Sequence, residues 1–271
     1  MTKIIHFSDS HAGGGAEDWL AYLDKRWVGV FNYKFRRQFQ HDQNNLILAV
    51  EYILDTKPDI VVCTGDLTST GQPGEFAMAK KILKPLRDSN IPVIYTPGNH
   101  DYYVKRTKCV RAMKEMVWYL TKGEYDFDDL PSVQRHGEID FIVVNESWPT
   151  NLLMSSGHLK RKSSQFIEKI CKQPKHYPRI MVGHYPLIED APIMRFRHRL
   201  FGQKHIVRLL KEGVIDLSLC GHIHRPYSKL NIDGKGEICA GSITRNGVIN
   251  EINYDEKTGL FKQQHLYLNN I

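Results

Sequence analysis

Five short apolar runs in this chain each end in a turn that carries aspartate, asparagine or histidine. The run at 91–95, for example, is followed by Thr96-Pro97-Gly98-Asn99-His100-Asp101. Strands that are apolar at nearly every position are buried on both faces, which is typical of a parallel sheet covered by helices. The loops after the carboxyl ends of such strands commonly carry the binding and catalytic groups of α/β proteins. One such turn alone could be a capped loop with no further role.

The other four turns have the same composition. They follow predicted strands at 3–8, 59–64, 179–182 and 214–220, and their polar residues are Asp9 with His11, Asp66, His184, and His222 with His224. A carboxylate and an imidazole one residue apart in a bent loop can converge on one ion. Carboxylate, imidazole and amide oxygen suit Mn, Fe, Zn or Mg better than an iron–sulfur cluster or a thiolate zinc site. Each turn singly fits ordinary hydrogen-bonded structure, whereas five at one end of a sheet system predict a metal site.

The order of the predicted elements indicates an α/β protein. Amphipathic helices are predicted at 42–56, 74–89, 104–122 and 159–171. Strands and helices alternate over the first hundred residues, which argues for a parallel sheet. Strands at 132–136 and 139–145 form a predicted hairpin, and the region after 226 resembles four short antiparallel strands. No repeat or linker divides the chain, so we expect one domain over residues 1–271, with inserted segments at about 16–40 and 190–205.

The inserted segment at about 16–40 is basic and aromatic. Trp27, Phe31 and Phe35 recur every four residues and would share one face of a helix. The basic residues that flank this face are Lys25, Arg26, Lys34, Arg36 and Arg37. Such a face suits a membrane surface or an acyl-bearing anionic substrate. The alternative is a helix packed on the core with a solvated basic rim, which describes most amphipathic helices.

The second inserted segment, at about 190–205, carries the sequence Arg195-Phe196-Arg197-His198-Arg199-Leu200-Phe201. Its alternation of charged and apolar residues fits a loop or a lid better than a core helix. A solvated connector is the competing interpretation.

Composition limits the class of protein. With 41% hydrophobic and 25% charged residues, the chain has the balance of a soluble globular protein. No apolar run approaches the length of a bilayer span, and the amino-terminal apolar stretch is too short for a signal peptide, so we expect a cytoplasmic protein. The five cysteines include no C-x-x-C pair and predict no disulfide framework. The net charge of +7 indicates an anionic partner or surface.

In their order along the chain, Asp9-x-His11, Gly65-Asp66, Gly98-Asn99-His100-Asp101, Gly183-His184 and Gly221-His222-x-His224 resemble the five motifs of the calcineurin-like metallophosphoesterases. The resemblance spans about residues 4–242, and every motif position is filled. It implies an α/β protein with a four-layer α/β/β/α sandwich of the metallophosphoesterase type. It also implies a metal-dependent phosphoesterase or phosphodiesterase, with two divalent ions (Mn, Fe, Zn or Mg) between the ends of two central sheets.

The same resemblance gives each motif residue an expected role. One ion would be bound by Asp9, His11 and His224, the other by Asn99, His184 and His222, and Asp66 would bridge both. A carboxylate suits the bridge because its two oxygens can hold two cations about 4 Å apart. The implied reaction is the in-line attack of a metal-bound hydroxide on phosphorus. His100 would act on the leaving oxygen, and Asp101 would orient His100 through its other ring nitrogen.

The substrate is a separate question, because motifs fix a reaction better than they fix a substrate. The two basic, aromatic segments resemble insertions of the UDP-2,3-diacylglucosamine hydrolases of lipid A synthesis. This resemblance implies a lipid-bearing nucleotide substrate and peripheral association with a membrane surface. A cyclic-nucleotide or general phosphodiesterase is the alternative.

Two other functions of the fold are less favoured. A repair nuclease is third, because the basic residues form no long stripe and no separate DNA-binding cap is recognisable, so nucleic acid is not an expected partner. A non-catalytic scaffold is the alternative of another class. The complete set of seven ligand positions argues against it.

Overall fold

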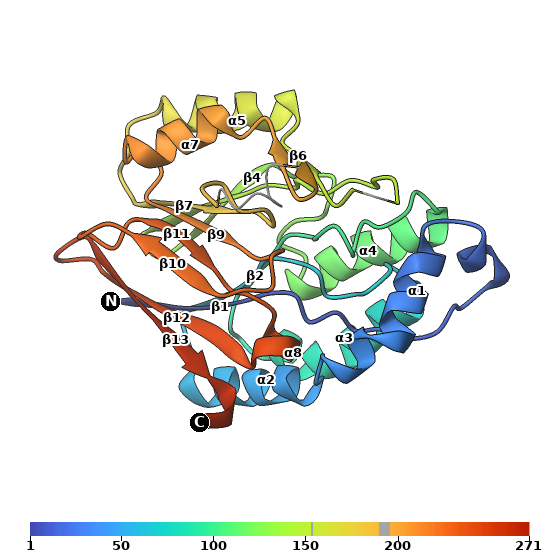
Figure 1. Cartoon of the computed structure of the whole chain (residues 1–271). Coiled ribbons are helices and arrows are strands. Elements are labelled where there is room, and N and C mark those ends of the chain that lie inside the picture. Colours follow the sequence, from blue (N-terminus) through green and yellow to red (C-terminus); the bar gives the residue numbers. More distant parts are fainter. Residues whose placement is uncertain (153, 190–195, 271) are drawn as a thin grey trace.

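The computed structural model describes residues 1–152, 154–189 and 196–270, and two β-sheets in it pack face to face between layers of helices (Figure 1). The first sheet has the order β13-β12-β1-β2-β3, and the second has the order β10-β11-β9-β7-β5-β4. The expected four-layer α/β/β/α sandwich is therefore confirmed.

The elements have the following bounds. The first sheet contains β1 (Thr2–Phe7), β2 (Ile60–Cys63), β3 (Val93–Tyr95), β12 (Val248–Asp255) and β13 (Leu260–Tyr267). The second contains β4 (Ser132–His136), β5 (Ile139–Val143), β7 (Arg179–Val182), β9 (Leu217–Cys220), β10 (Tyr227–Leu230) and β11 (Gly236–Cys239). The longer helices are α1 (Arg26–Phe35), α2 (Asn44–Thr56), α3 (Pro73–Asp88), α4 (Thr107–Leu120), α5 (Arg161–Cys171) and α7 (Lys204–Lys211). Short elements are β6 (Gly157–His158), β8 (Leu200–Phe201), α8 (Ile243–Asn246), η1 (Trp19–Tyr22), η2 (Arg37–Phe39) and η3 (Leu268–Asn270).

The amino-terminal half builds the parallel part of the first sheet, as predicted. β1 pairs in parallel with β2, and β2 with β3. All four residues of β2 are buried, which explains why the strand is apolar throughout. Helices α2 and α3 form the crossovers and bury the apolar stripes that the sequence indicates, for example Leu46, Val50 and Ile53 on α2.

The prediction of four antiparallel strands after residue 226 is partly wrong. β10 and β11 pair antiparallel, but β11 also pairs in parallel with β9 in the second sheet. β12 and β13 belong to the first sheet, where β12 runs antiparallel to β1. The chain thus changes sheets at α8. Strand periodicity could not show this, because it reports which face of a strand is buried and not which strand is its neighbour.

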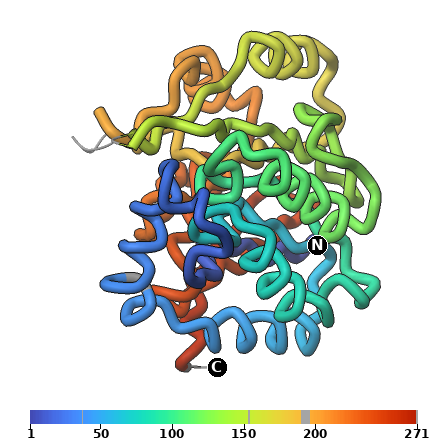
Figure 2. Tube along the Cα trace, turned by 90° about the vertical axis from the view of Figure 1, so that its right-hand side faces the viewer, coloured from blue at the N-terminus to red at the C-terminus, as the bar shows by residue number. Residues whose placement is uncertain are grey.

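Most of the core in the described ranges consists of two large clusters of buried side chains on opposite faces of the second sheet, and a third, small cluster is formed by Tyr103, Val104 and Cys109. Phe141 and Val143 of β5 pack between the sheets, with residues of the first sheet and of α2, α3 and α4. Ile142 and the following Val144 face the other way and pack with α5 and α7. Figure 2 shows α5 and α7 on one side of the molecule and α2 on the opposite side. Within the described ranges, no helix combines the length and the apolar composition needed to cross a bilayer.

The inserted helix α1 lies at one end of the sandwich (Figure 1). Trp27, Phe31 and Phe35 are 46%, 55% and 61% exposed, respectively. The alternative interpretation, in which this aromatic face packs on the core, is therefore wrong. The prediction that Arg26 flanks the aromatic face is also wrong, because Arg26 is fully buried. Its guanidinium binds Asp24 at 2.9 and 3.0 Å, and this pairing allows a buried charge.

The second inserted segment is only partly a loop. Residues 190–195, with Arg195 of the basic, aromatic patch, lie outside the described residues. Phe196 is exposed, and Leu200 pairs with β6 through the short strand β8. From Lys204 to Lys211 the chain forms helix α7, with Ile206 buried against the second sheet. This helix lies mostly beyond the inserted segment, and its apolar residues three and four positions apart form a core-facing stripe. Within the patch, the loop prediction is wrong at Leu200 and Phe201, which form β8.

Candidate metal centre

The loops after β1, β2, β3, β7 and β9 bring the predicted ligands to one end of the two sheets. Asp9 and His11 follow β1, Asp66 follows β2, and Asn99 follows β3. His184 follows β7, and His222 and His224 follow β9. Parallel strands place these turns together, because their carboxyl ends share one edge. Asp9, His11, Asp66 and His184 are at most 1% exposed, so the candidate centre is built from buried groups.

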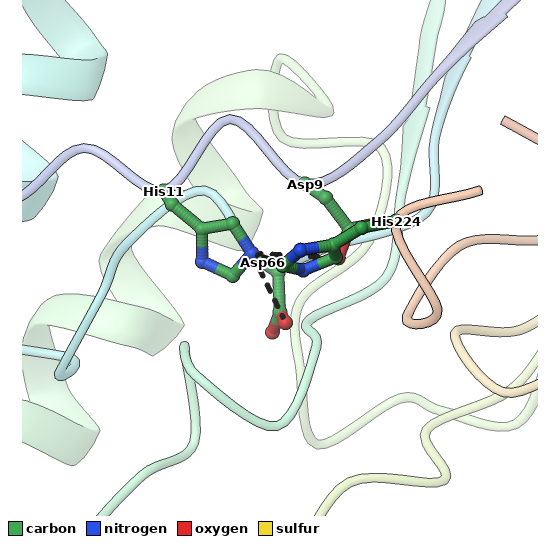
Figure 3. Close-up of side chains that lie close together, drawn as sticks. All are labelled: Asp9, His11, Asp66 and His224. Carbon is green, nitrogen blue, oxygen red and sulfur yellow. Dashed lines mark hydrogen bonds and ion pairs between the residues drawn. The ribbon is translucent and has the colours of Figure 1, made fainter. Parts of the chain in front are cut away.

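The first cluster consists of Asp9, His11, Asp66 and His224, whose candidate ligand atoms all lie within 4.8 Å of one another. His11 Nε2 lies 2.7 Å from His224 Nε2 and 3.5 Å from Asp9 Oδ1. The Oδ2 atom of Asp66 is 3.8 Å from His11 Nε2. Figure 3 shows these four side chains converging from three separate loops. The geometry has the size and ligand types of a divalent metal site.

The second cluster shares Asp66 with the first. Its candidate ligand atoms, from Asp66, His184 and His222, again lie within 4.8 Å of one another. His184 Nε2 is 3.4 Å from Asp66 Oδ2 and 3.2 Å from Asn99 Oδ1. A carboxylate common to two clusters is what a two-metal centre requires of its bridge.

The carboxylates of Asp9 and Asp66 show whether these residues fit metal ions, because only one oxygen of each accepts a hydrogen bond in the described part of the chain. Asp9 Oδ2 accepts the backbone N–H of His222 at 3.0 Å, and Asp66 Oδ1 accepts that of His100 at 2.7 Å. The other two oxygens, Asp9 Oδ1 and Asp66 Oδ2, are buried and accept no hydrogen bond from the described residues. Buried anionic oxygens without donors are costly. A bound cation would remove that cost, so the donor set fits a divalent ion at each cluster.

Backbone strain is concentrated at the same residues. Seven non-glycine residues in the described ranges have positive φ, and five of them are Asp9 (57°), His11 (47°), Asp66 (54°), His222 (70°) and His224 (54°). A left-handed conformation costs roughly 1–3 kcal/mol at a non-glycine residue, and it persists where the surrounding structure imposes it. The strain supports a functional role, because it turns these side chains toward a common point.

The imidazole rings are oriented by backbone carbonyls. The Nδ1 atoms of His11 and His184 lie 3.2 Å and 2.6 Å from the carbonyl oxygens of Thr68 and Thr64. Because a carbonyl can only accept, each Nδ1 carries the proton, and Nε2 is the atom that can bind a metal ion. Burial lowers the pKa of His184, but the carboxylates of Asp66 and Asp9 outweigh burial and raise it to about 10. This excess of negative charge favours a cation in the centre.

Glycines permit the close approach of the motif loops. A Cβ atom at Gly98 would lie 2.1 Å from Asp66 Oδ1, and one at Gly221 would lie 2.3 Å from Asp9 Oδ2. No side chain fits at these distances. The glycines before Asn99 and His222 are therefore needed so that each loop can touch the carboxylate of its neighbour.

His100 lies at the centre, but the structure contradicts the expected role of Asp101 as its orienting partner. His100 Nδ1 is 2.6 Å from the carbonyl oxygen of Ser69, which takes the position expected for Asp101. Asp101 instead accepts the hydroxyl of Tyr95 at 2.9 Å, the N–H of Gly98 at 3.0 Å and the N–H of Thr68 at 3.0 Å. Asp101 is thus a buried cross-link between the loops after β2 and β3, where four polar donors surround it.

Sequence reasoning missed three residues around the candidate ligands. His198 Nδ1 lies 2.8 Å from His222 Nε2, and the ring of His41 lies 5.2 Å from that of His11. Glu146 Oε2 accepts the N–H of His184 at 2.9 Å. His41 and His198 stand within or next to the two inserted segments, so a histidine in each segment was the available signal.

The calcineurin-like phosphoesterase family model matches residues 2–226 of the chain. The chain belongs to this family. Members of the family use a binuclear divalent metal centre, and the two clusters around Asp66 provide the residues that could hold it.

Individual relatives are more distant. A probable glycerophosphodiester phosphodiesterase from Arcobacter nitrofigilis is 27% identical over 69% of this chain and 63% of its own length. A cAMP/cGMP dual specificity phosphodiesterase from Mycobacterium tuberculosis is 22% identical over 82% of this chain and 61% of its own length. The chain thus spans less than two thirds of either relative. The structure of a purple acid phosphatase from yellow lupin seeds superposes with a TM-score of 0.66, at 13% identity over 99% of this chain and 52% of that one, which shows a shared fold.

Proposed function

We propose that the chain hydrolyses phosphodiester or pyrophosphate bonds at a two-metal centre. One ion would be held by Asp9, His11 and His224, the other by Asn99, His184 and His222, with Asp66 between them. The observation that carries this proposal is the convergence of Asp9 Oδ1 and Asp66 Oδ2 on the histidine nitrogens of both clusters, because these two buried oxygens have no hydrogen-bond donor among the described residues. We further propose that residues 1–271 act as one domain, because β1 pairs with β12, and the last strand, β13, belongs to the same sheet.

The protein's own side chains would hold the metal ions and contact the leaving oxygen of the substrate, and its backbone would orient these side chains. The two ions, when bound, would supply Lewis acidity toward the phosphoryl oxygens and an activated water. His100 would face the leaving oxygen, with Nδ1 fixed by the Ser69 carbonyl so that Nε2 makes any contact with the substrate. Asp101 would act only through position, by holding the loop of Asn99 against that of Asp66.

Metal analysis together with a generic substrate tests this proposal. The purified protein, saturated with Mn²⁺, should bind two ions and hydrolyse bis(4-nitrophenyl) phosphate. Asp66→Asn should lose at least one ion and lower kcat by a factor of about 10³ or more, since it removes the shared ligand. Asp55→Asn, at an exposed position on α2, is the matched control and should change neither. Fewer than two ions and no hydrolysis by the unaltered protein would favour a non-catalytic scaffold.

A lipid-bearing nucleotide such as UDP-2,3-diacylglucosamine is the finer substrate that we propose, with peripheral association at a membrane surface. The exposed aromatic face of α1 supports it, because Trp27, Phe31 and Phe35 lie beside helix positions that line the catalytic cavity. Aromatic side chains next to basic ones suit the interface of an anionic bilayer. Serine at all three positions should reduce binding to vesicles of phosphatidylglycerol and leave hydrolysis of a small soluble diester intact. Equal loss of both would contradict this role.

A cyclic-nucleotide or general phosphodiesterase is the second candidate. The names of the two relatives above, a glycerophosphodiester phosphodiesterase and a cAMP/cGMP phosphodiesterase, favour it. Turnover of cyclic AMP by the purified protein, with no turnover of the diacylated sugar nucleotide in mixed micelles, would select this candidate.

A further inference from the structure

A cavity of about 550 Å³ adjoins the candidate metal centre and is strongly cationic. Asp66, Asn99 and His100 form part of its wall. Four cations, which we call the cationic rim, also line it: Lys25, Arg36, Arg197 and Arg245. Asp66 is the only carboxylate among the described lining residues, and none of the four cations has a carboxylate within ion-pair distance in the described part of the chain. Among the described residues, the rim therefore has no carboxylate partner.

Helix α1 and its two flanking residues present a buried face, a solvent-exposed face and a face that lines the cavity. Arg26, Gly29 and Val30 are buried. Trp27, Phe31 and Phe35 are exposed, whereas Val28, Asn32 and the two rim residues Lys25 and Arg36 line the cavity. The helix thus directs one face at the cavity, with Asn32 on that face and the cations Lys25 and Arg36 at its two ends.

Close packing fixes α1 against the loops of the metal centre. A Cβ atom at Gly29 would lie 2.3 Å from Thr70 Cγ2, on the loop that follows Asp66. One turn further along the same face of the helix, Tyr33 lies against Gly13, where a Cβ atom would be 2.2 Å from the Tyr33 ring. The position of the rim is thus set by backbone contact with the loops that carry the ligands.

A stack of side chains joins the rim to the centre. Lys25 Nζ lies 4.4 Å from the ring centroid of Tyr103, and the Tyr103 ring stacks on His100 at 5.2 Å with an angle of 14°. Lys25 Nζ also donates to Thr150 Oγ1 at 2.8 Å. Burial, with the nearby Arg197, lowers the pKa of Lys25 to about 8, so the ammonium group is poorly compensated where it stands. An anion beside His100 would compensate it.

The charge of the rim exceeds what a simple diester needs. A phosphodiester carries one negative charge, and the ions of the centre would already interact with it. Further cations around the same group would repel one another at a cost that increases as they lose water. A second phosphoryl group, joined directly to the first, would offset that repulsion within a cavity of this size.

We propose that the substrate is a diphosphate diester, with the scissile phosphoryl group at the metal centre and its neighbour bound by the cationic rim, foremost Lys25 and Arg197. This inference rests on the proposed function and narrows it to pyrophosphate bonds. Water adds to the phosphorus at the centre and the bridging P–O bond breaks. The products are two phosphomonoesters, and two protons are released at neutral pH. No redox partner or further reactant is needed.

UDP-glucose and bis(4-nitrophenyl) phosphate are the probes, since the first is a soluble diphosphate diester and the second a monoanionic diester. Lys25→Ala and Arg197→Ala should each raise KM for UDP-glucose about 10-fold or more, because a charge-assisted hydrogen bond is lost. Their kcat/KM for bis(4-nitrophenyl) phosphate should stay within about threefold. Lys262→Ala, at an exposed position on β13, should change neither, and the conservative Lys25→Arg should recover most of the loss.

Calorimetry of UDP-glucose binding provides a readout without turnover. In the Asp66→Asn background, Lys25→Ala should weaken binding by a similar factor. Equal losses on both probes, or no change on UDP-glucose, would overturn the role of the rim while the metal-dependent hydrolysis of the simple diester stands. If the unaltered protein, loaded with Mn²⁺, cleaves neither probe, the proposed function itself fails.

Discussion

The metal centre and the cationic rim lie side by side but are built in different ways. The centre consists of mostly buried side chains on short turns; five of its seven candidate ligands have left-handed backbone, and glycines allow contact between the loops. The rim consists of long, flexible cations from α1, from the segment around Arg197 and from Arg245, which are distant in the sequence. The first arrangement dictates a reaction, and the second selects among substrates. The difference suggests that the two can be damaged separately.

The largest effect should come from adding a methyl group between two motif loops. Gly221→Ala would place a Cβ atom 2.1 Å from Ser8 Oγ and 2.3 Å from Asp9 Oδ2, so the loop of Asp9 must move. We expect bound metal to fall below two ions and kcat/KM for both probes to fall about 100-fold or more. Gly14→Ala, where a Cβ atom would meet nothing within 4 Å, is the control for the added methyl. Unchanged metal content in Gly221→Ala would remove the argument from close packing.

A smaller effect is expected where the inserted segments support the centre. His198 Nδ1 is positioned to accept the N–H of His222 Nε2, which would leave the buried Nδ1 atom of His222 for an ion. His198→Ala should weaken binding of the second ion by roughly 10–100-fold, as measured by titration calorimetry. His198→Asn can accept the same N–H and should retain more affinity. The exposed His158→Ala serves as the control. If all three variants bind metal alike, His198 has no positioning role.

A change that moves α1 should affect the rim and spare the centre. Gly29→Ala should raise KM for UDP-glucose by about tenfold, because its Cβ atom would meet Thr70 Cγ2 at 2.3 Å and push the helix outward. The double variant Gly29→Ala with Thr70→Ser removes that methyl and keeps the hydroxyl that binds Glu75, so it should restore KM. A parallel loss of diester hydrolysis would show that α1 and the centre cannot be separated.

The smallest effect concerns the core strand beneath the centre. Burial lowers the pKa of His6 to about 3, so His6 is neutral in the folded protein and protonates in the unfolded chain below about pH 6.5. The free energy of unfolding should therefore fall as the pH falls from 6.5, by up to about 1.4 kcal/mol per pH unit for this group. In urea titrations at pH 7 and pH 5, His6→Gln should show a shallower loss than the unaltered protein. The exposed His176→Gln should show no such change.

The parts of the fold that follow from local pattern could be predicted. The strands before Asp9, Asp66, Asn99, His184 and His222 were expected within three residues, because a buried apolar run between helices has few other interpretations. The pairing of β11 with β9, and the change of sheets at α8, were not expected, since strand partners depend on contacts distant in the sequence.

The candidate metal ligands could be predicted from the sequence better than the residues around them. Turn residues such as Asp66 and Asn99 could be predicted because each directly follows a glycine at the end of an apolar run, a pattern that is local in the sequence. By contrast, the sequence led us to expect that Asp101 orients His100, whereas the carbonyl oxygen of Ser69 contacts His100 Nδ1 instead. His41 and His198 come close to the centre only through tertiary packing of the inserted segments, which no spacing in the sequence reveals.

The pairing of β1 with β12 has a consequence for synthesis. Residues Thr2–His6 pair with residues 250–254, and the carbonyl oxygens of Ser8 and Asp9 accept hydrogen bonds from Ile243 and Ser242. The turn that holds Asp9 is thus synthesised more than 200 residues before the segment that supports it. A nascent chain stalled before residue 242 would expose one edge of β1 and lack these anchors. Metal capture should therefore follow the synthesis and docking of this supporting segment.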